Sequence, residues 1–301
     1  MRVAAVLVNY GQWELTRRSI ESLRCSEGVD VAITLVDNCS PGDVPEWVGG
    51  MKELRFLRLP ENTGFAGGNN RGFEASLQDE AEFTFFLNND AEVFPGTVAG
   101  LAGHLAENPD TGVVAPAVYW KSDPDRLWGA GGRLVRWKMR YEQVELPEGH
   151  HGPEAFVPAD FVSGCAMMVR TDILKRTGGF REDFFMYYED ADLCRRVIEK
   201  GFRVGVLPGL RVLHSVGSSS GGQLSKLAIY FSDRNRFVLA RDLLSPSMKA
   251  VFLLYKTAVN LVITVKFLLW QGPSLIPWLW RGYLHGITGR TGYRDVIGRL
   301  T

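Results

Sequence analysis

The first 106 residues alternate between apolar runs of strand length and segments with helical periodicity. The apolar runs cover residues 3–8, 32–36, 54–59 and 83–87, and the helical segments cover residues 13–23, 67–77 and 97–106. Parallel strands need long crossover connections and are buried on both faces, so their sequences are almost continuously apolar. The alternation therefore predicts an α/β fold in which helices flank a mostly parallel central sheet.

Polar residues follow four of the predicted strands. They are Asn9 and Tyr10, Asp37 and Asn38, Asn62 with Gly64, and the run Asn88, Asn89 and Asp90. In an open α/β sheet, ligands bind at the edge formed by the carboxyl ends of the strands. We therefore expect one binding site at this edge, built from all four strand ends.

The pattern changes after residue 118, and we distinguish three regions: residues 1–118, 119–222 and 223–301. Residues 119–158 combine Pro, Gly and charged residues with tryptophans such as Trp128, which predicts an irregular insertion or hairpin that faces a substrate. Strands are predicted at residues 161–169, 202–207 and 211–214, with a short helix from Thr171.

Composition excludes some classes of partner. Lys plus Arg and Asp plus Glu are equal at 34 each, so no net positive field attracts nucleic acid. The four cysteines have no CxxC spacing, which indicates reduced, cytosolic usage. The N-terminal apolar run is too short for a signal-peptide core, so we expect a cytoplasmic protein.

The run MYYEDADLCRR, residues 186–196, carries three carboxylates at the start of a predicted helix. The helical period places Asp190 on the apolar, inward face and Glu189 and Asp192 on the other side, where Asp192 can pair with Arg196. A helix-cap role for Asp190 remains an alternative. An inward acid flanked by aromatic residues has raised basicity, which favours Asp190 as the group that moves a proton.

Asp90 follows the apolar run FTFFL and precedes a predicted helix. A carboxylate in this place can bind a hard divalent cation that takes up diphosphate charge, although Asn and Asp are also common in turns and caps. His214, at the end of another apolar run, is a candidate second ligand, although a single histidine is more often structural.

The glycine-rich segment 60–70 precedes a helix and offers backbone amides to phosphate. It lacks the lysine of a P-loop, and it follows the third strand rather than the first, which argues against a dinucleotide fingerprint. The alternative is a simple turn before a capped helix.

Residues 250–270 of the C-terminal region are apolar over nearly the length of a membrane span. Lys249, Lys256, Thr257, Asn260 and Thr264 share one helical face. Lysines inside a span are costly, so we expect an amphipathic helix that lies in the plane of a membrane surface. A tail packed on the domain, or on the partner of a homodimer, is the alternative.

Several motifs together resemble the family 2 inverting glycosyltransferases of GT-A fold, and most closely the rhamnosyltransferase-type members. The motifs are VNYGQWELTRRSIESL, LVDNCSPGD, ENTGFAGGNNRGF, FLNNDAEV, VSGCAMMVR, GGFREDFFMYYEDADLCRR and VLHSVGSS. They occur in order between residues 2 and 220. Asn88 stands where the first Asp of the family's DXD motif often lies, which shifts metal binding toward Asp90 and His214.

The resemblance implies transfer of a sugar from a nucleotide diphosphate donor, best dTDP-rhamnose or else a UDP-hexose. The acceptor would be a saccharide or lipid-linked saccharide of polysaccharide biosynthesis, at the cytoplasmic face of the membrane. It implies Mg²⁺ or Mn²⁺ at Asp90 and His214, with Glu92 as an uncertain addition, and Asp190 as base supported by Glu189. The implied nucleotide-sugar residues are Asn9, Tyr10, Asp37, Asn38, Asn62, Gly64, Phe65, Gly67, Asn69, Asn70, Asn88, Asn89 and Gly164. Trp128, Tyr187 and Tyr188 are candidates for acceptor contact, although the two tyrosines can equally serve packing.

Two other classes of function compete with this interpretation. A nucleotidyltransferase would need a glycine-rich basic loop directly after the first strand, where this chain has NYGQWELTRRS. A non-catalytic sugar-nucleotide-binding protein would be indicated by loss of the candidate acids, and both Asp90 and Asp190 are present.

Overall fold

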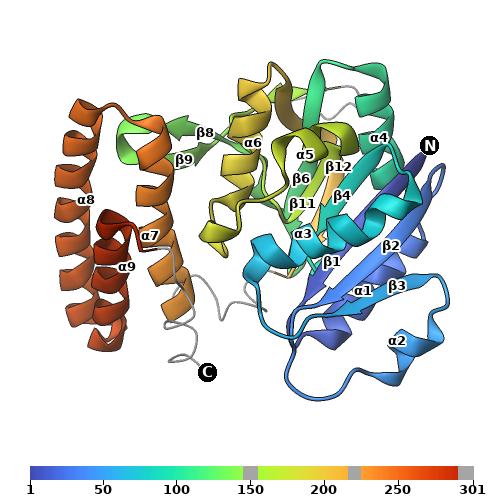
Figure 1. Ribbon diagram of the computed structural model, residues 1–301, viewed down its shortest axis with the longest axis horizontal. Coiled ribbons are helices and arrows are strands. Elements are labelled where there is room, and N and C mark those ends of the chain that lie inside the picture. The colour runs from blue at the N-terminus through green and yellow to red at the C-terminus, as the bar shows by residue number, and fades with distance from the viewer. Residues whose placement is uncertain (145–154, 216–224, 291–301) are drawn as a thin grey trace.

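The computed structural model describes residues 1–144, 155–215 and 225–290, and its largest element is one sheet of ten strands. The main path of the sheet has the order β10-β12-β6-β11-β4-β1-β2-β3, with β5 beside β12 and β7 beside β6 (Figure 1). The strands are β1 (Arg2–Asn9), β2 (Asp30–Asp37), β3 (Leu54–Arg58), β4 (Phe83–Leu87), β5 (Ala91–Val93), β6 (Thr111–Trp120), β7 (Asp123–Gly129), β10 (Val157–Pro158), β11 (Ala166–Arg170) and β12 (Arg203–His214).

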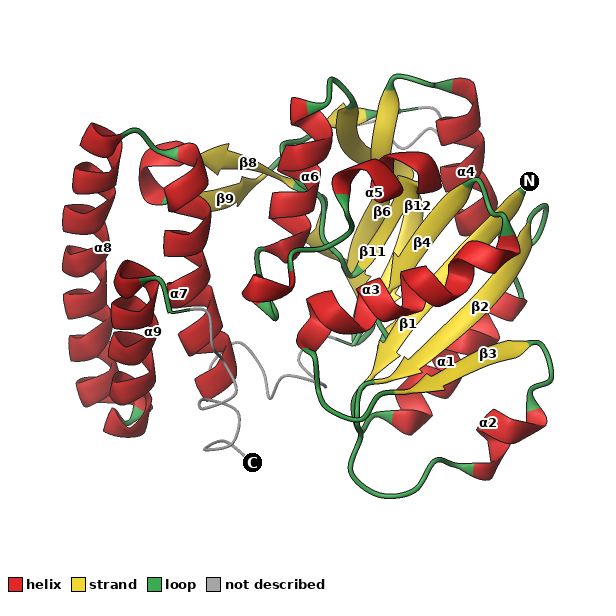
Figure 2. Cartoon of the chain, viewed as in Figure 1, coloured by secondary structure: helices red, strands yellow, loops and turns green. Residues whose placement is uncertain are grey.

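Helices cover both faces of the sheet (Figure 2). They are α1 (Trp13–Arg24), α2 (Glu46–Gly50), α3 (Gly64–Ser76), α4 (Thr97–Glu107), α5 (Thr171–Thr177) and α6 (Glu189–Glu199), with 3₁₀ turns at Leu77–Asp79, Arg136–Lys138 and Glu182–Phe184. The core forms two layers because alternate residues of β1 face opposite sides. Leu7 packs with Ile20 of α1 on one face, and Val6 packs with Phe73 of α3 on the other.

The predicted elements of the first 106 residues are confirmed, and those of the middle region need correction. β6 has no predicted counterpart. The two strands expected at residues 202–207 and 211–214 form one strand, β12, with an irregular register between Leu207 and Arg211. The strand expected from residue 161 begins at Ala166. Residues 119–144 form strands, including the hairpin of β8 (Gly132–Val135) and β9 (Arg140–Gln143), while residues 145–154 of that segment and residues 216–219 of the last motif lie outside the described residues.

The described part of the tail is a group of helices beside the sheet domain, not one isolated helix (Figure 1). It contains α7 (Lys226–Leu243), α8 (Pro246–Lys266), a π-helical turn (Phe267–Gln271), a 3₁₀ turn (Pro273–Leu275) and α9 (Ile276–Thr288). Ser225 and Ser245 cap α7 and α8 with their side-chain oxygens, as helix N-caps commonly do.

The polar face of α8 points into the protein. Lys256 is 2% exposed and forms an ion pair with the buried Asp233 of α7, and Asn260, which is fully buried, donates to the same carboxylate at 3.2 Å. The opposite face is apolar and open: Leu254 is 73% exposed and Leu261 is 55% exposed. A surface helix normally shows the reverse arrangement, so α8 presents a hydrophobic surface outward.

Candidate active site

Asn9, at the carboxyl end of β1, joins three strand ends through hydrogen bonds. Its Oδ1 accepts from the backbone nitrogen of Gln12 at 3.1 Å and the hydroxyl of Thr16 at 2.9 Å, and its Nδ2 donates to Ser40 Oγ at 3.1 Å. Asn89, after β4, donates to both Asn9 and Thr16. Both asparagines are buried, so their hydrogen bonds hold the strand ends together at this edge of the sheet.

Asn38, after β2, holds the glycine-rich loop in place. Its Oδ1 accepts from the backbone nitrogen of Thr63 at 2.9 Å, and its Nδ2 donates to Asn62 Oδ1 at 3.0 Å and to the oxygen of Gly64 at 2.9 Å. A Cβ at Gly67 would lie 2.6 Å from Thr63, so the loop needs glycine at that close approach. The loop thereby lies at the same edge as the end of β2.

Asp37 is fully buried and pairs with Arg58 of β3 at 3.2 Å. Arg58 also donates to the backbone oxygens of Ser40 and Gly42. The sequence analysis missed Arg58 because an arginine within a strand carries no distinctive motif. Tyr10, the neighbour of Asn9, is partly exposed and remains accessible to a ligand.

The first turns of α3 connect the loop to the segment before α6. Asn69 donates to the oxygen of Phe65 at 2.9 Å. Asn70 donates to the backbone oxygen of Phe180 at 2.8 Å and to Glu182 at 3.1 Å, and accepts from the nitrogen of Phe180 at 2.8 Å. Asn69 and Asn70 therefore stabilise the structure of the site through hydrogen bonds, which could not be predicted from sequence spacing.

Asp90 and His214 lie together, as predicted. Nε2 of His214 is 3.0 Å from Oδ1 of Asp90, both side chains are buried, and Asn88 Nδ2 lies 3.5 Å from the same imidazole nitrogen. Burial alone would lower the pKa of His214, but Cys165 and Asp90 raise this pKa to about 10. Trp128 packs edge-on against the imidazole at 4.9 Å. Without a cation the imidazole would therefore hold a proton beside Asp90, and a metal ion that binds His214 would displace this proton.

Glu92 is placed differently. Its carboxylate forms an ion pair with Lys121. In the pairing of β5 with β12, Ala91 lies opposite His214 and Glu92 lies opposite Leu213, so the side chains of Glu92 and Ala91 point to opposite faces. We therefore leave Glu92 out of the candidate metal site.

Asp190 is partly exposed at the start of α6, and backbone amides hold both of its oxygens. Gly164 donates to Oδ2 at 3.0 Å and Ala191 donates to Oδ1 at 2.7 Å. A Cβ at Gly164 would lie 3.0 Å from the Phe65 ring and 3.4 Å from the Cβ of Asp190, so the carboxylate, the loop aromatic and this glycine are in close contact.

The segment around Gly164 links the two acidic parts of the site. The amide of Gly164 binds Asp190, and the carbonyl of its neighbour Cys165 accepts from the backbone nitrogen of Asn88 at 2.7 Å. Asn88 is two residues before Asp90. The described structure therefore brings the candidate base and the candidate metal ligands to opposite ends of one short segment.

The helical projection was wrong for all three acids: Asp190, which was expected to point inward, is the most exposed of them. Glu189 is 5% exposed and Asp192 is fully buried, rather than both facing outward. Asp192 pairs with Arg196 at 2.7 Å, as predicted, and also with Arg195 at 3.0 Å and Arg181 at 3.4 Å. The projection considered one helix alone, whereas Arg181 of the segment before α6 lies against Asp192 and also pairs with Asp242 of α7.

Burial changes the proton affinity of the acid pair. Burial raises the pKa of Glu189 well above its ordinary value, and the charge of Asp190 raises it further. Burial also raises the pKa of Asp190, while the amides of Gly164 and Ala191 oppose the increase. A carboxylate with a raised pKa is a better general base when it is ionised.

The turn before α6 has an unusual backbone. Phe185, Tyr187 and Tyr188 all have positive φ angles, of 65°, 68° and 75°. Met186 donates to the oxygen of Phe184 at 2.8 Å across Phe185, whose ψ is −59°, which defines a strained γ-turn. Such strain persists only where surrounding contacts impose it, and it is common at active sites.

The aromatic residues proposed for the acceptor are partly buried. The hydroxyl of Tyr188 accepts from Arg236 of α7 at 2.8 Å, and its ring lies 6.2 Å from that of Tyr141. Tyr187 packs on the small cluster around Phe231. Their contacts account for packing, while their partial exposure leaves acceptor contact as a proposal.

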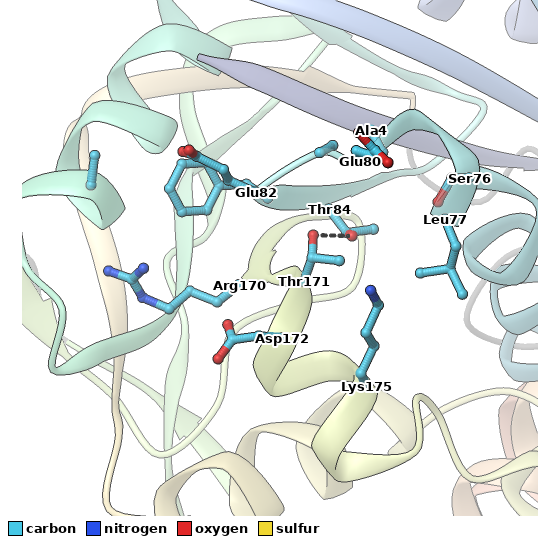
Figure 3. Close-up of a pocket in the computed structure, with 13 residues that line it drawn as sticks. Ala4, Ser76, Leu77, Glu80, Glu82, Thr84, Arg170, Thr171, Asp172 and Lys175 are labelled. Atoms are coloured by element: carbon cyan, nitrogen blue, oxygen red, sulfur yellow. Dashed lines mark hydrogen bonds between the residues drawn. The ribbon is translucent and has the colours of Figure 1, made fainter.

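A separate hollow of about 780 Å³ lies at the other edge of the sheet (Figure 3). It is lined by Ala4 and Thr84 near the starts of β1 and β4, and by Thr171, whose hydroxyl is 3.0 Å from that of Thr84. Arg170 faces this hollow but donates to the backbone of Leu105 and Asn108. The hollow lies away from the carboxyl ends of β1 and β4 and takes no part in the candidate site.

A mostly parallel sheet covered by helices, with polar strand ends and a pair of acids at the start of α6, defines a glycosyltransferase of GT-A fold. The model of glycosyl transferase family 2 matches residues 4–178, more than half of the chain, and the protein belongs to this family.

Relatives and solved structures agree with this assignment. The chain is 23% identical to the low-salt glycan biosynthesis hexosyltransferase Agl10 of Haloferax volcanii, over 96% of this chain and 92% of the relative. It is 26% identical to an N-acetylglucosaminyl-diphospho-decaprenol L-rhamnosyltransferase of Mycobacterium tuberculosis, over 72% of this chain and 76% of the relative. The mannosyltransferase PcManGT from Pyrobaculum calidifontis, in complex with GDP-Man and Mn²⁺, has the same fold, with a TM-score of 0.60, 15% identity, and coverage of 96% of this chain and 87% of that chain.

Proposed function

We propose that this glycosyltransferase moves a sugar, with inversion at the anomeric carbon, from a nucleotide diphosphate donor to a hydroxyl of a saccharide or lipid-linked saccharide acceptor. The proposed donor is dTDP-rhamnose, and the transferred sugar is rhamnose. The mycobacterial relative's name, which includes both a rhamnosyl group and a lipid-linked sugar, supports this choice. The observation that carries the mechanism is the partly exposed Asp190 carboxylate, held by two backbone amides.

In the proposed reaction Asp190 takes the proton of the acceptor hydroxyl. The hydroxyl oxygen forms a bond to the anomeric carbon as the bond from that carbon to the diphosphate oxygen breaks. A base on the face opposite the leaving group gives inversion in a single displacement. Glu189, which is buried beside Asp190, is the proposed supporting residue.

Asp90 and His214 are the proposed protein ligands of a divalent cation, Mg²⁺ or Mn²⁺. A carboxylate with an imidazole suits Mn²⁺, and carboxylates together with substrate phosphates suit Mg²⁺. The ring of His214 is held by packing on Trp128 and by the contact of Nε2 with Asp90. The described residues include no cluster of three metal-binding side chains, so the donor diphosphate would complete the coordination. When bound, the ion would neutralise the charge that develops on the leaving diphosphate.

The exposed apolar face of α8 is the proposed contact with a membrane surface. Within the described residues, one helical stretch, Pro246–Trp270, is long and apolar enough to cross a membrane, and 22% of its most apolar window is buried. Lys249 and Lys266 are exposed near its ends, and residues 243–290 contain no acidic residue, which favours a helix that lies on an anionic surface. Such contact at the cytoplasmic face would bring the site to a lipid-linked acceptor. A homodimer formed through the same face is the second candidate.

A donor panel tests the proposed function. The purified full chain is incubated with a lipid-linked saccharide and either dTDP-rhamnose, UDP-hexoses or GDP-mannose, with Mn²⁺ or with EDTA, and products are measured by mass spectrometry. We expect rhamnosylated product only with Mn²⁺ or Mg²⁺. Transfer from another donor would correct the donor assignment, and full turnover in EDTA would contradict the metal site.

A further inference from the structure

The γ-turn that leads into the catalytic helix is held by the helical tail. The side-chain Nδ2 of Asn235, in α7, lies within donating distance of three carbonyls of this turn: Phe184 at 3.0 Å, Met186 at 2.8 Å and Tyr187 at 2.7 Å. Asn235 itself is fully buried. A single side-chain amide therefore supplies hydrogen bonds to backbone carbonyls that lie outside any helix or strand.

Arg234 fixes the orientation of this amide. Its Nε donates to Oδ1 of Asn235 at 2.9 Å, which directs Nδ2 toward the turn. The same guanidinium donates to the backbone oxygens of Asp183 and Phe184. Arg234 is fully buried, and its Cζ lies 5.1 Å from the centre of the Phe231 ring. Arg234 and Asn235 are therefore held by packing as well as by hydrogen bonds.

The other side of the turn contacts the donor loop. The oxygen of Phe185 accepts from the backbone nitrogen of Ala66 at 3.2 Å, in the first turn of α3. A Cβ at Gly64 would lie 2.4 Å from both the ring and the oxygen of Phe185. The turn is therefore clamped between the glycine-rich loop on one side and Asn235 on the other.

The turn ends at the acids. Tyr188, which has a positive φ of 75°, is the residue directly before α6, and Glu189 and Asp190 are the first two residues of that helix. Any relaxation of the turn changes where α6 begins and so moves the Asp190 carboxylate. Displacement of a reacting group by about 1 Å can lower a rate on the order of 100-fold.

From these contacts we infer that Asn235 is a positioning residue for the transfer reaction: its amide holds the strained turn that sets the place of Asp190 relative to the donor loop. This inference rests on the proposed role of Asp190. It assigns a function to Arg234 and Asn235, two adjacent buried polar residues of α7 that the sequence motifs did not explain.

Asn235→Leu removes both donor hydrogens and keeps the number of side-chain heavy atoms and their branching, and Asn260→Leu is the matched control. Asn260 is also a fully buried asparagine of the tail, but its contacts are with Asp233 and Lys256 rather than with the turn. We expect both variants to lose thermal stability, while kcat falls on the order of 100-fold only in Asn235→Leu. The KM for the donor should change by less than about threefold. Asn235→Ser, which keeps one donor hydrogen, should have an intermediate kcat, and it serves as the test if Asn235→Leu does not fold.

Hydrogen exchange of the backbone amides of residues 184–191 is measured on the same samples and needs no substrate. Loss of protection in the Asn235 variants, with protection retained in Asn260→Leu, is the expected result. Unchanged protection, or an equal loss of kcat in the Asn260 control, would overturn the inference. Failure of the wild-type chain to use any donor would instead contradict the proposed function and leave the exchange result to decide the role of Asn235.

Discussion

The backbone amide of Gly164 donates a hydrogen bond to Oδ2 of Asp190 at 3.0 Å. This bond joins the segment before β11 to the first turn of α6. Cys165, the next residue, binds Asn88 through its carbonyl, so the same segment also supports the turn that carries Asp90.

Glu189→Gln should stabilise the protein at high pH. The pKa of Glu189 is raised in the folded state, so the wild-type side chain contributes stability below its unfolded pKa, near about 4.3, and loses that contribution as the pH rises through the folded value. A neutral amide avoids this loss. Melting temperatures from pH 4 to 9 should show a gain for the variant that grows with pH, and an equal or lower melting temperature at pH 8 would contradict the raised pKa.

Asp90→Asn and His214→Ala should each weaken metal-dependent donor binding by at least about tenfold. Both remove a proposed ligand, and a donor that binds only the folded state raises the melting temperature by an amount that grows with the logarithm of its affinity. The measurement is the thermal shift produced by dTDP-rhamnose with Mn²⁺ and with EDTA. Glu92→Gln, whose carboxylate binds Lys121, is the matched control and should keep the Mn²⁺-dependent shift. Equal shifts in all three variants would remove Asp90 and His214 from the metal site.

Gly64→Ala should destabilise the fold by about 2–4 kcal/mol, because the new methyl group meets Phe185 at 2.4 Å and the φ of +74° is unfavourable for alanine. Gly42→Ala is the control, since its φ of +82° carries the same backbone strain but no atom lies within 4 Å. It should cost only about 1 kcal/mol. Chemical denaturation measures both, and equal losses would show that the contact with Phe185 has no energetic weight.

Leu254→Glu together with Leu261→Glu should lower binding to vesicles that contain anionic lipid by about tenfold or more, because each leucine buried in the membrane contributes about 1.5–3 kcal/mol. Leu77→Glu, at an exposed leucine outside the tail, should leave binding unchanged. Vesicle flotation is the measurement. If the wild-type chain stays off the vesicles and sediments as a dimer that the double variant dissociates, the exposed face of α8 is a dimer interface.

The sequence predicts the first half of the fold well because each apolar run there has a single interpretation. It also predicts the proximity of Asp90 and His214, since both follow strand ends of one sheet. The burial of Asp192 and the inward polar face of α8 were not predictable, because each depends on which neighbour packs on the helix. Lys256 looks like a solvent-facing residue until Asp233, 23 residues earlier in the chain, supplies its partner. Arg58 and Asn235 were missed for the same reason: their roles consist of contacts with distant backbone atoms.

The most direct test of the account is single-turnover transfer by Asp190→Asn, measured beside donor binding by the same protein. The substitution keeps the shape of the side chain but removes the base. The account predicts a rate lower by about 100-fold or more, with a donor-induced thermal shift like that of the wild type. A variant that is folded and transfers the sugar at a rate close to that of the wild type would show that Asp190 is not the base.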